Sequence, residues 1–198
     1  MKTTISLSLF ILLFWATGIH AQVRVQKGNL SALKGIKQMA VKFTYENMGV
    51  GKFEKEEDYL NKKVAEYNKK EAGKGDKWRA AWVNDRKTRF EPKFIQLFEK
   101  NAPVVLVDAP ADTKYTMIVN TDFTEPGFNI AIVRKFAEIR TTITIVETAS
   151  NKPVATLSAA GPGRTYGGYD FDTGVRIAEA YAKVGKDLGK YVYRKGIK

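Results

Sequence analysis

The chain contains no cysteine and only one histidine among its 198 residues. Without cysteine it can form no disulfide, carry no lipid-modified cysteine and offer no thiolate as a nucleophile or metal ligand. The single histidine, His20, falls in an N-terminal segment that has the pattern of a signal peptide. The mature chain is therefore predicted to lack both residue types, which excludes His- or Cys-based zinc sites, Ser-His-Asp hydrolysis and Cys-His proteolysis. Carboxylate, lysine and tyrosine chemistry remains.

Long apolar runs are also scarce, because residues 5–15 form the only one. This run follows Lys2 and precedes the end Ile19-His20-Ala21, an arrangement typical of a secretory signal peptide cleaved after Ala21. A helix that spans a membrane would need roughly 20 apolar residues. We therefore expect residues 1–21 to be a signal peptide and the protein to be periplasmic or secreted. We expect no transmembrane segment in the mature chain.

Acidic residues are few relative to basic ones, with 21 Asp and Glu against 33 Lys and Arg and a net charge of +12. Removing 21 of the 198 residues leaves 177 with a net charge of +11, a length that fits one domain with a continuous core. The positive surplus favours an acidic partner, which can be an envelope protein, an anionic lipid or an acidic glycan. Nucleic acid is a poor fit for an exported protein. Alternatively, the charges only solvate long helices.

Consecutive β-strands are predicted only between Tyr115 and Gly161. Three segments there, residues 115–123, 136–147 and 154–160, alternate between two faces and are rich in β-branched residues. The turn between the second and third segments is short and contains Ser-Asn-Lys-Pro, so these two strands should pair as a hairpin. The sequence thus predicts a three-stranded antiparallel meander, which is a scaffold and indicates no reaction.

Two more strands are predicted upstream of the meander. Residues 38–46 alternate as a half-buried strand does, and residues 104–107 form a short apolar strand. Residues 22–37 are polar and unpatterned and are predicted to be an extended N-terminal arm, which leaves residues 38–198 as a single α+β domain. Residues 48–53 contain two glycines, but the lysine is not followed by Ser or Thr, which excludes a phosphate-binding loop.

Helical periodicity between these strands predicts one helix over residues 54–71 and another that begins at Asp76 and is kinked or restarted by Pro92. Trp78 and Trp82 lie one turn apart on the second helix. They are either a platform on which sugar rings stack or anchors that hold this helix to the sheet. The second interpretation is favoured because large aromatic side chains dominate protein cores.

The last helix is predicted from Asp172 or Thr173 to about Arg194. Gly185 and Gly189 lie on a stripe of small residues along this helix, although glycine inside a helix costs roughly 0.8–1 kcal/mol relative to alanine. We infer that the helix backbone packs closely against the sheet at this stripe. The opposite face is rich in lysine and is available to an anionic surface.

Two loops carry the candidate site residues. In the loop after the first meander strand, Asp122 and Glu125 are candidates for the paired carboxylates of a glycosidase, although a carboxylate beside Pro-Gly more often forms a turn. The loop after the third strand lacks the glycine spacing of a dinucleotide-binding fingerprint and offers Arg164 and Tyr166 for contacts. Both strands run in the same direction, so both loops leave the same edge of the sheet. These four residues are the predicted binding residues, and no metal site is predicted.

Together, the elements predict an α+β fold: a mixed sheet with a three-stranded antiparallel meander packed on long helices, in the order β-α-α-β-β-β-β-α. Residues 106–127 contain a Thr-Asp-Phe…Pro-Gly strand end, and residues 137–168 contain an Ile-Val-Glu-Thr strand and a Gly-rich link to the last helix. These segments, about half of the chain, resemble the amino-terminal domain of TolB, the curli-secretion lipoprotein CsgG and related uncharacterised envelope proteins. The resemblance implies a fold and an envelope setting and supplies no catalytic residue. The missing lipoprotein cysteine departs from many such proteins.

The function expected from the sequence is that of an exported, non-enzymatic envelope protein, which binds an envelope component and needs no cofactor. One alternative is a carbohydrate-active hydrolase that uses Asp122 and Glu125. The other alternative is a structural subunit of an oligomeric envelope assembly.

Overall fold

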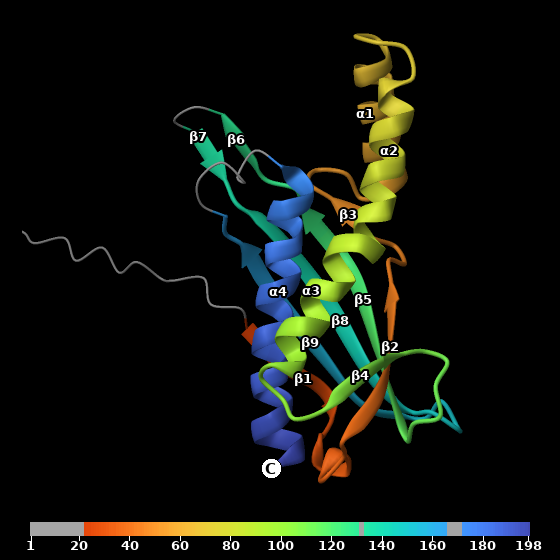
Figure 1. Ribbon diagram of the computed structural model, residues 1–198, viewed down its shortest axis with the longest axis vertical. Coiled ribbons are helices and arrows are strands. Elements are labelled where there is room, and N and C mark those ends of the chain that lie inside the picture. Colours follow the sequence, from red (N-terminus) through yellow and green to blue (C-terminus); the bar gives the residue numbers. More distant parts are fainter. Residues whose placement is uncertain (1–21, 131–132, 166–171) are drawn as a thin grey trace, which may run out of the picture.

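The structure is a computed structural model that describes residues 22–130, 133–165 and 172–198. It confirms the α+β class: a seven-stranded mixed sheet carries two long helical segments on one face (Figure 1). The predicted signal peptide, residues 1–21, lies outside the described residues.

The strands are β1 (Gln22–Gly28), β2 (Gln38–Thr44), β3 (Gly49–Val50), β4 (Val105–Asp108), β5 (Tyr115–Glu125), β8 (Ala137–Glu147) and β9 (Pro153–Gly163). Their order across the sheet is β1-β9-β8-β5-β2-β4, and β3 also pairs with β5. The pairs among β1, β9, β8 and β5 are antiparallel, whereas β2 is parallel to both β5 and β4. The predicted meander is therefore confirmed as β5, β8 and β9.

The alternation within the meander places its apolar residues on one face. Val119, Ile143 and Leu157 occupy neighbouring register positions on β5, β8 and β9, and each is fully buried. This row and its equivalents form the core between the sheet and the last helix, α4 (Thr173–Val192). Successive residues of a strand point to opposite sides, so the other half of each strand faces away from the helices.

The N-terminal arm predicted for residues 22–37 is corrected by the structure. Its first part, β1, pairs antiparallel with β9 and completes that side of the sheet. A 3₁₀ turn at Ser31–Leu33 follows, and Leu30 and Leu33 are buried in the core. Polar, weakly patterned strands are typical of a sheet edge, where only one side of the strand is paired, and this composition hid β1 from the sequence pattern.

The two predicted helices after β2 form a longer, connected region. It consists of α1 (Glu56–Asn68), α2 (Lys74–Asp85), a π-helical turn η2 (Arg86–Phe90) and α3 (Glu91–Glu99). Pro92 lies at the start of α3, where a missing N–H group is tolerated. The α1–α2 hairpin projects beyond the sheet, while α3 lies beside α4 (Figure 1).

Trp78 and Trp82 are structural, as predicted, and their aromatic partners lie on α1. Tyr59 of α1 lies 5.9 Å from Trp78 and 5.3 Å from Trp82 between ring centroids. The two tryptophan rings are 5.7 Å apart, and Tyr67 also contacts Trp78. This aromatic cluster holds α1 and α2 together, and Trp82 is buried in the same hydrophobic core as Val50 of β3.

The glycine stripe of α4 is buried, but it faces α3 rather than the sheet. A Cβ atom added at Gly185 would lie 2.3 Å from the backbone oxygen of Phe94, and one at Gly189 would lie 2.6 Å from that of Phe98. The predicted close approach of the α4 backbone is thus confirmed, but its partner is α3 and not the sheet. The helix begins as predicted, since the Asp172 side chain caps it by accepting from the N–H groups of residues 174 and 175.

The connection between β5 and β8 contains a small ribbon that the sequence pattern did not indicate. The predicted loop at 121–127 is mostly strand, because β5 continues to Glu125. After Pro126-Gly127, β6 (Phe128–Ile130) pairs antiparallel with β7 (Val133–Lys135), which leads into β8. Three-residue strands are too short for a period-2 pattern to be recognised.

Candidate functional site

The face of the sheet opposite α4 is polar and carries a groove. Side chains on this face come from alternate residues of β2, β5, β8 and β9 and are mainly hydroxyls and amides: Thr44, Thr116, Asn120, Thr142, Thr144, Thr156 and Ser158. At one end of the face lies a groove of about 620 Å³. Its lining includes Arg24, Asn47, Glu54, Asp122, Phe123, Arg140 and Ser158.

Asp122 lies in this groove because β5 bulges there. The register between β5 and β8 shifts between Thr121 and Phe123, so Asp122 has no partner of its own across the strand pair. One carboxylate oxygen accepts from Asn120 Nδ2 at 2.8 Å, and the other accepts from Thr142 Oγ1 at 2.8 Å. The carboxylate is therefore held by neutral donors at the floor of the groove.

Two arginines contribute positive charge to the groove. The Arg140 guanidinium lies 3.9 Å from the centroid of the Phe123 ring, which it faces across the β5–β8 pair. Arg140 is exposed, and no carboxylate lies within ion-pair distance of it among the described residues. Arg24 of β1 stands opposite Ser158 of β9. Stacking orients a guanidinium while its edge keeps hydrogen-bond donors for a ligand.

Glu125, the second predicted carboxylate, has a different environment. It forms an ion pair of 2.6 Å with Lys135 and accepts from the backbone N–H of Gly127 at 3.1 Å. Both contacts fasten the base of the β6–β7 ribbon. Glu125 is absent from the residues that line the groove, so the structure does not join it with Asp122 in that cavity.

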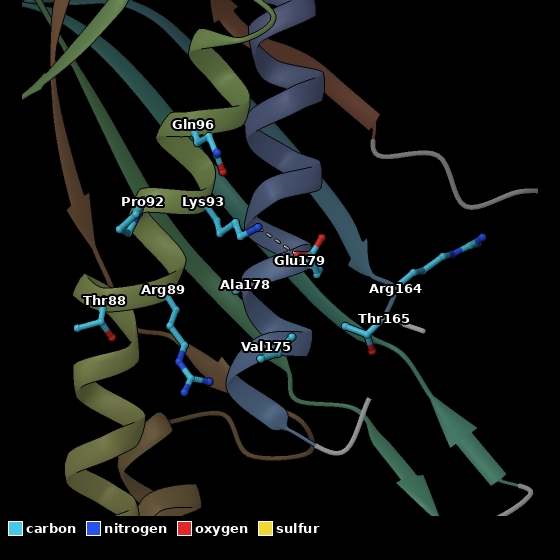
Figure 2. A pocket seen from close by; sticks show the side chains of 10 residues that line it. All are labelled: Thr88, Arg89, Pro92, Lys93, Gln96, Arg164, Thr165, Val175, Ala178 and Glu179. Carbon is cyan, nitrogen blue, oxygen red and sulfur yellow. Dashed lines mark ion pairs between the residues drawn. The ribbon is translucent and has the colours of Figure 1, made fainter. Parts of the chain in front are cut away.

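Arg164 lines a second groove, of about 960 Å³, on the helical side of the sheet (Figure 2). Its walls come from α3 and α4, where Lys93 and Glu179 form an ion pair of 3.6 Å, and from the end of β9. The guanidinium of Arg164 also lies 5.4 Å from the centroid of the Phe136 ring. Tyr166 lies outside the described residues.

The predicted shared edge is present, although its residues do not form one site. Glu125, Glu138 and Pro162 occupy adjacent register positions, so β5 and β9 do end at the same side of the sheet. However, Asp122 lines the groove on the helix-free face and Arg164 lines the groove on the helical face. Sequence reasoning missed Arg24 and Arg140, whose contribution depends on strand register.

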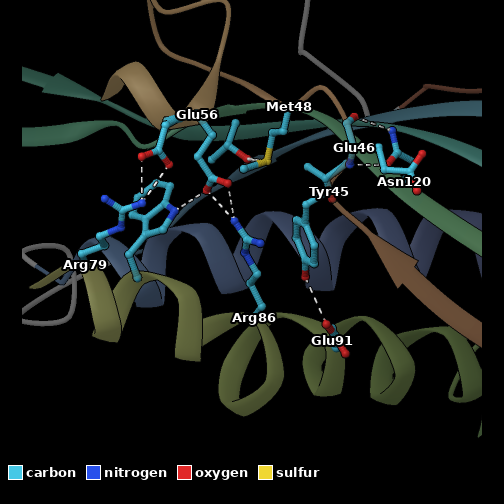
Figure 3. Close-up of polar contacts among 12 residues, drawn as sticks. Tyr45, Glu46, Met48, Glu56, Arg79, Arg86, Glu91 and Asn120 are labelled. Carbon is cyan, nitrogen blue, oxygen red and sulfur yellow. Dashed lines mark hydrogen bonds and ion pairs between the residues drawn. The ribbon is translucent and has the colours of Figure 1, made fainter. Parts of the chain in front are cut away.

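A separate polar cluster joins the helical hairpin to the sheet (Figure 3). Glu56 accepts from Trp82 Nε1 at 2.6 Å, and Arg86 Nη2 donates to both oxygens of Glu56 at 2.5 Å. The guanidinium of Arg86 lies 4.0 Å from the centroid of the Tyr45 ring, at the end of β2. This cluster thus connects α1, α2 and the π-helical turn with the sheet.

The cluster continues into the core. The Tyr45 hydroxyl donates to Glu91 Oε1 at 3.2 Å, and Lys87 donates to the other oxygen of Glu91 at 2.7 Å. Deeper in the core, the hydroxyls of Tyr181 and Thr121 lie 2.6 Å apart. Burial raises the pKa of both tyrosines, which keeps them protonated as hydrogen-bond donors. Among the residues that the structure describes, each buried side-chain polar atom has a hydrogen-bond partner, as a structural network requires.

Residues 22–130, 133–165 and 172–198 contain no group of three or more Asp, Glu or His side chains arranged to hold a metal ion. Within the same residues, no helix combines the length and the hydrophobicity needed to cross a bilayer.

Comparison with known proteins finds solved structures that align with most of the chain at very low identity and with TM-scores below 0.5. No protein-family profile and no curated sequence matches the chain. A variant of PelC from Paraburkholderia phytofirmans, solved as a dodecamer, shares 8% identity over 88% of this chain and 98% of its own, with a TM-score of 0.44. Protein XCC0632 of Xanthomonas campestris, of family DUF330, shares 10% identity over 84% and 90% of the two chains, with a TM-score of 0.39.

A third structure is a minor lipoprotein from Acinetobacter baumannii. It shares 10% identity over 81% of this chain and 96% of its own, with a TM-score of 0.29. Identities and scores of this size assign neither a family nor a function to this chain. The resemblance to TolB and CsgG is not shown by these comparisons and stays a prediction.

Proposed function

We propose that the mature chain is an exported, non-enzymatic protein of the cell envelope, which binds an acidic glycan in the groove on the helix-free face of the sheet. The observation that carries the proposal is the lining of this groove. Two arginines, Arg24 and Arg140, stand there with the carboxylate of Asp122 and the hydroxyl of Ser158 around the aromatic ring of Phe123.

The mixture of donors and acceptors fits a sugar chain that bears carboxylates. Arginine binds a carboxylate in a planar, two-pronged geometry. An ionised carboxylate such as Asp122 can only accept hydrogen bonds, so it suits ligand hydroxyls rather than ligand anions. Asp122 and Glu54 would repel an unbroken run of phosphates, and a concave site does not match a flat bilayer. Sugar hydroxyls beside acidic groups satisfy both kinds of side chain.

The carboxylate contacts support a binding role rather than hydrolysis. Asp122 is hydrogen-bonded to Asn120 and Thr142, and Glu125 is paired with Lys135. Each contact has a structural purpose at the bulge or at the base of the ribbon. Paired glycosidase carboxylates instead flank one cavity.

Replacing Arg140 with alanine should weaken binding of a polyuronate about tenfold or more, since hydrogen bonds to charged groups contribute about 1.5–3 kcal/mol. Isothermal titration calorimetry of the mature chain with polygalacturonate measures this affinity. Arg194→Ala is the matched control, because it removes the same side chain and charge from an exposed position in the C-terminal π-helical turn. Affinity of the wild type should also fall as salt rises, because exposed charges are screened over about 8 Å at physiological ionic strength.

Equal loss in both variants would assign the effect to net charge alone and contradict a specific groove. Turnover of the glycan that disappears in an Asp122→Ala, Glu125→Ala variant would establish the hydrolase alternative instead. A stable multimer in light scattering, with no glycan affinity, would favour the structural-subunit alternative.

The predicted export of the protein can be tested separately. If residues 1–21 are a cleaved signal peptide, mass spectrometry of the protein from its native host should find a mature chain that begins at Gln22, either free or cyclised. Recovery of the chain with Met1 intact would contradict export by this route.

A further inference from the structure

The β6–β7 ribbon exposes apolar side chains that nothing in the described chain covers. Ile130 and Val133 face each other across the ribbon and are 67% and 54% exposed. Phe128 on the same face and the adjoining Phe136 are 39% and 37% exposed. Single exposed apolar residues are common on protein surfaces, but three on one short ribbon, with a fourth directly after it, form a patch that requires an explanation.

The ribbon is fixed to the body of the protein at its base. The buried Arg176 of α4 donates to the backbone oxygens of Pro126 and Gly127, each at 3.3 Å. Lys135 at the end of β7 is paired with Glu125 at the end of β5. The left-handed conformation of Gly127, with φ of +64°, brings the two strands so close that a Cβ atom would lie 2.4 Å from the Lys135 oxygen. The apolar patch therefore lies on a ribbon whose base is held in place by the body of the protein.

Basic residues flank the patch, and one of them, Lys135, is paired with Glu125. Arg134 and Lys135 lie on β7. The guanidinium groups of Arg134 and Arg164 lie 5.8 Å and 5.4 Å from the centroid of the Phe136 ring. The sequence has no carboxylate between Glu125 and Glu138. Apolar side chains flanked by arginine and lysine suit the interface of an anionic bilayer, where the rings and aliphatic groups enter the headgroup region and the cations stay near the phosphates.

A second basic element projects from the same end of the molecule. The α1–α2 hairpin extends past the sheet at the end where the ribbon protrudes, and the C-terminus lies at the opposite end (Figure 1). The turn of the hairpin together with the start of α2, residues 69–77, carries four lysines against one Glu and one Asp. Basic residues close to an anionic membrane are attracted to its surface.

We propose that the β6–β7 ribbon is a membrane-docking element, which inserts Phe128, Ile130, Val133 and Phe136 into the headgroup region of an anionic bilayer. The lysines of the α1–α2 turn add electrostatic attraction at the same end. This inference is independent of glycan binding, because the groove residues belong to a different part of the sheet. It places the protein on a membrane surface without a covalent lipid or a spanning helix.

Val133→Asp should lower the affinity of the mature chain for vesicles of equal parts phosphatidylglycerol and phosphatidylethanolamine about tenfold or more, because it removes an inserted apolar group and adds a repelled charge. Vesicle co-sedimentation measures the affinity. Val105→Asp is the matched control: Val105 on β4 is 56% exposed, so the two variants make the same chemical change at the same exposure. The control should bind as the wild type does.

The absence of cysteine allows a direct measurement of insertion. An Ile130→Cys variant labelled with an environment-sensitive fluorophore should shift its emission to the blue when these vesicles are added, while a Val105→Cys label should not. Equal affinities of the two aspartate variants, or no shift at position 130, would overturn the proposal. A dimer that forms without vesicles and is lost only in Val133→Asp would also overturn it, because the ribbon would then bind a second copy of the chain. Arg140→Ala should leave vesicle binding unchanged, which separates this test from the test of the groove.

Discussion

Replacing Glu56 with alanine is expected to lower the free energy of unfolding by about 3 kcal/mol, the lower end of the range for removing one partner of a buried ion pair, because this pair is partly buried. Glu56 accepts from both Arg86 and the indole N–H of Trp82, and the side chains of the ion pair are only 17–18% exposed. Its loss would leave a guanidinium and an indole N–H without their acceptor beneath the helical hairpin. Thermal or urea unfolding of the mature chain measures the change.

The neighbouring residue provides the control for this prediction. Glu57 also binds an arginine through both oxygens, but its partner Arg79 is 39% exposed and Glu57 itself is 58% exposed. Exposed ion pairs contribute about 0–1 kcal/mol, so Glu57→Ala should change stability little. The two variants remove the same group from adjacent positions of one helix and differ in burial. Equal effects would show that the Glu56 cluster does not stabilise the attachment of the hairpin.

Replacing Gly185 with leucine is expected to cost about 3 kcal/mol, the upper end of the usual overpacking range. A single Cβ atom at this position would already come within 2.3 Å of the Phe94 backbone oxygen, so α3 and α4 must separate to admit a larger side chain. The gain of about 1 kcal/mol from replacing a helical glycine offsets only part of this cost. For a chain of this size, the melting temperature should fall by about 6–12 °C.

Lys186→Leu is the matched control for the glycine, because Lys186 is the next residue of α4 and is exposed. It introduces the same side chain without meeting α3, and it should leave the melting temperature nearly unchanged. A stability of Gly185→Leu equal to that of the wild type would mean that the two helices do not approach each other as closely as described.

The strong elements of this fold could be predicted because their side-chain patterns are local. Alternation over eleven residues in β5 and β8 marks strands whatever lies next to them, and the Asp172 cap and the small-residue stripe mark α4. The edge strand β1 was missed because it is polar and weakly patterned. The strands β6 and β7 were missed because three residues carry too few alternating positions to form a pattern. These strands are identified by the strands with which they pair and not by their own composition.

The candidate site could be predicted only in part. Asp122 was predicted as a site residue because it is a carboxylate close to a turn, and it does line the groove on the helix-free face. The contribution of Arg24 and Arg140 to the groove could not be predicted, because the two residues are 116 positions apart in the sequence. They line the same groove only because β1 and β8 both pair with β9. Glu125 and Arg164 lie near the same edge and serve other contacts.

By itself, the sequence determined the α+β class, the meander, the final helix and the absence of cysteine chemistry, because each follows from residue type or from a period along the chain. Only the tertiary structure decided what each surface faces. It turned Gly185 and Gly189 toward α3, Trp78 and Trp82 toward α1, and one polar face of the sheet away from α4. The periodicity of apolar residues along the sequence indicates that one side of a helix or strand is buried. The identity of its neighbour depends on register and on packing between segments that are distant in sequence.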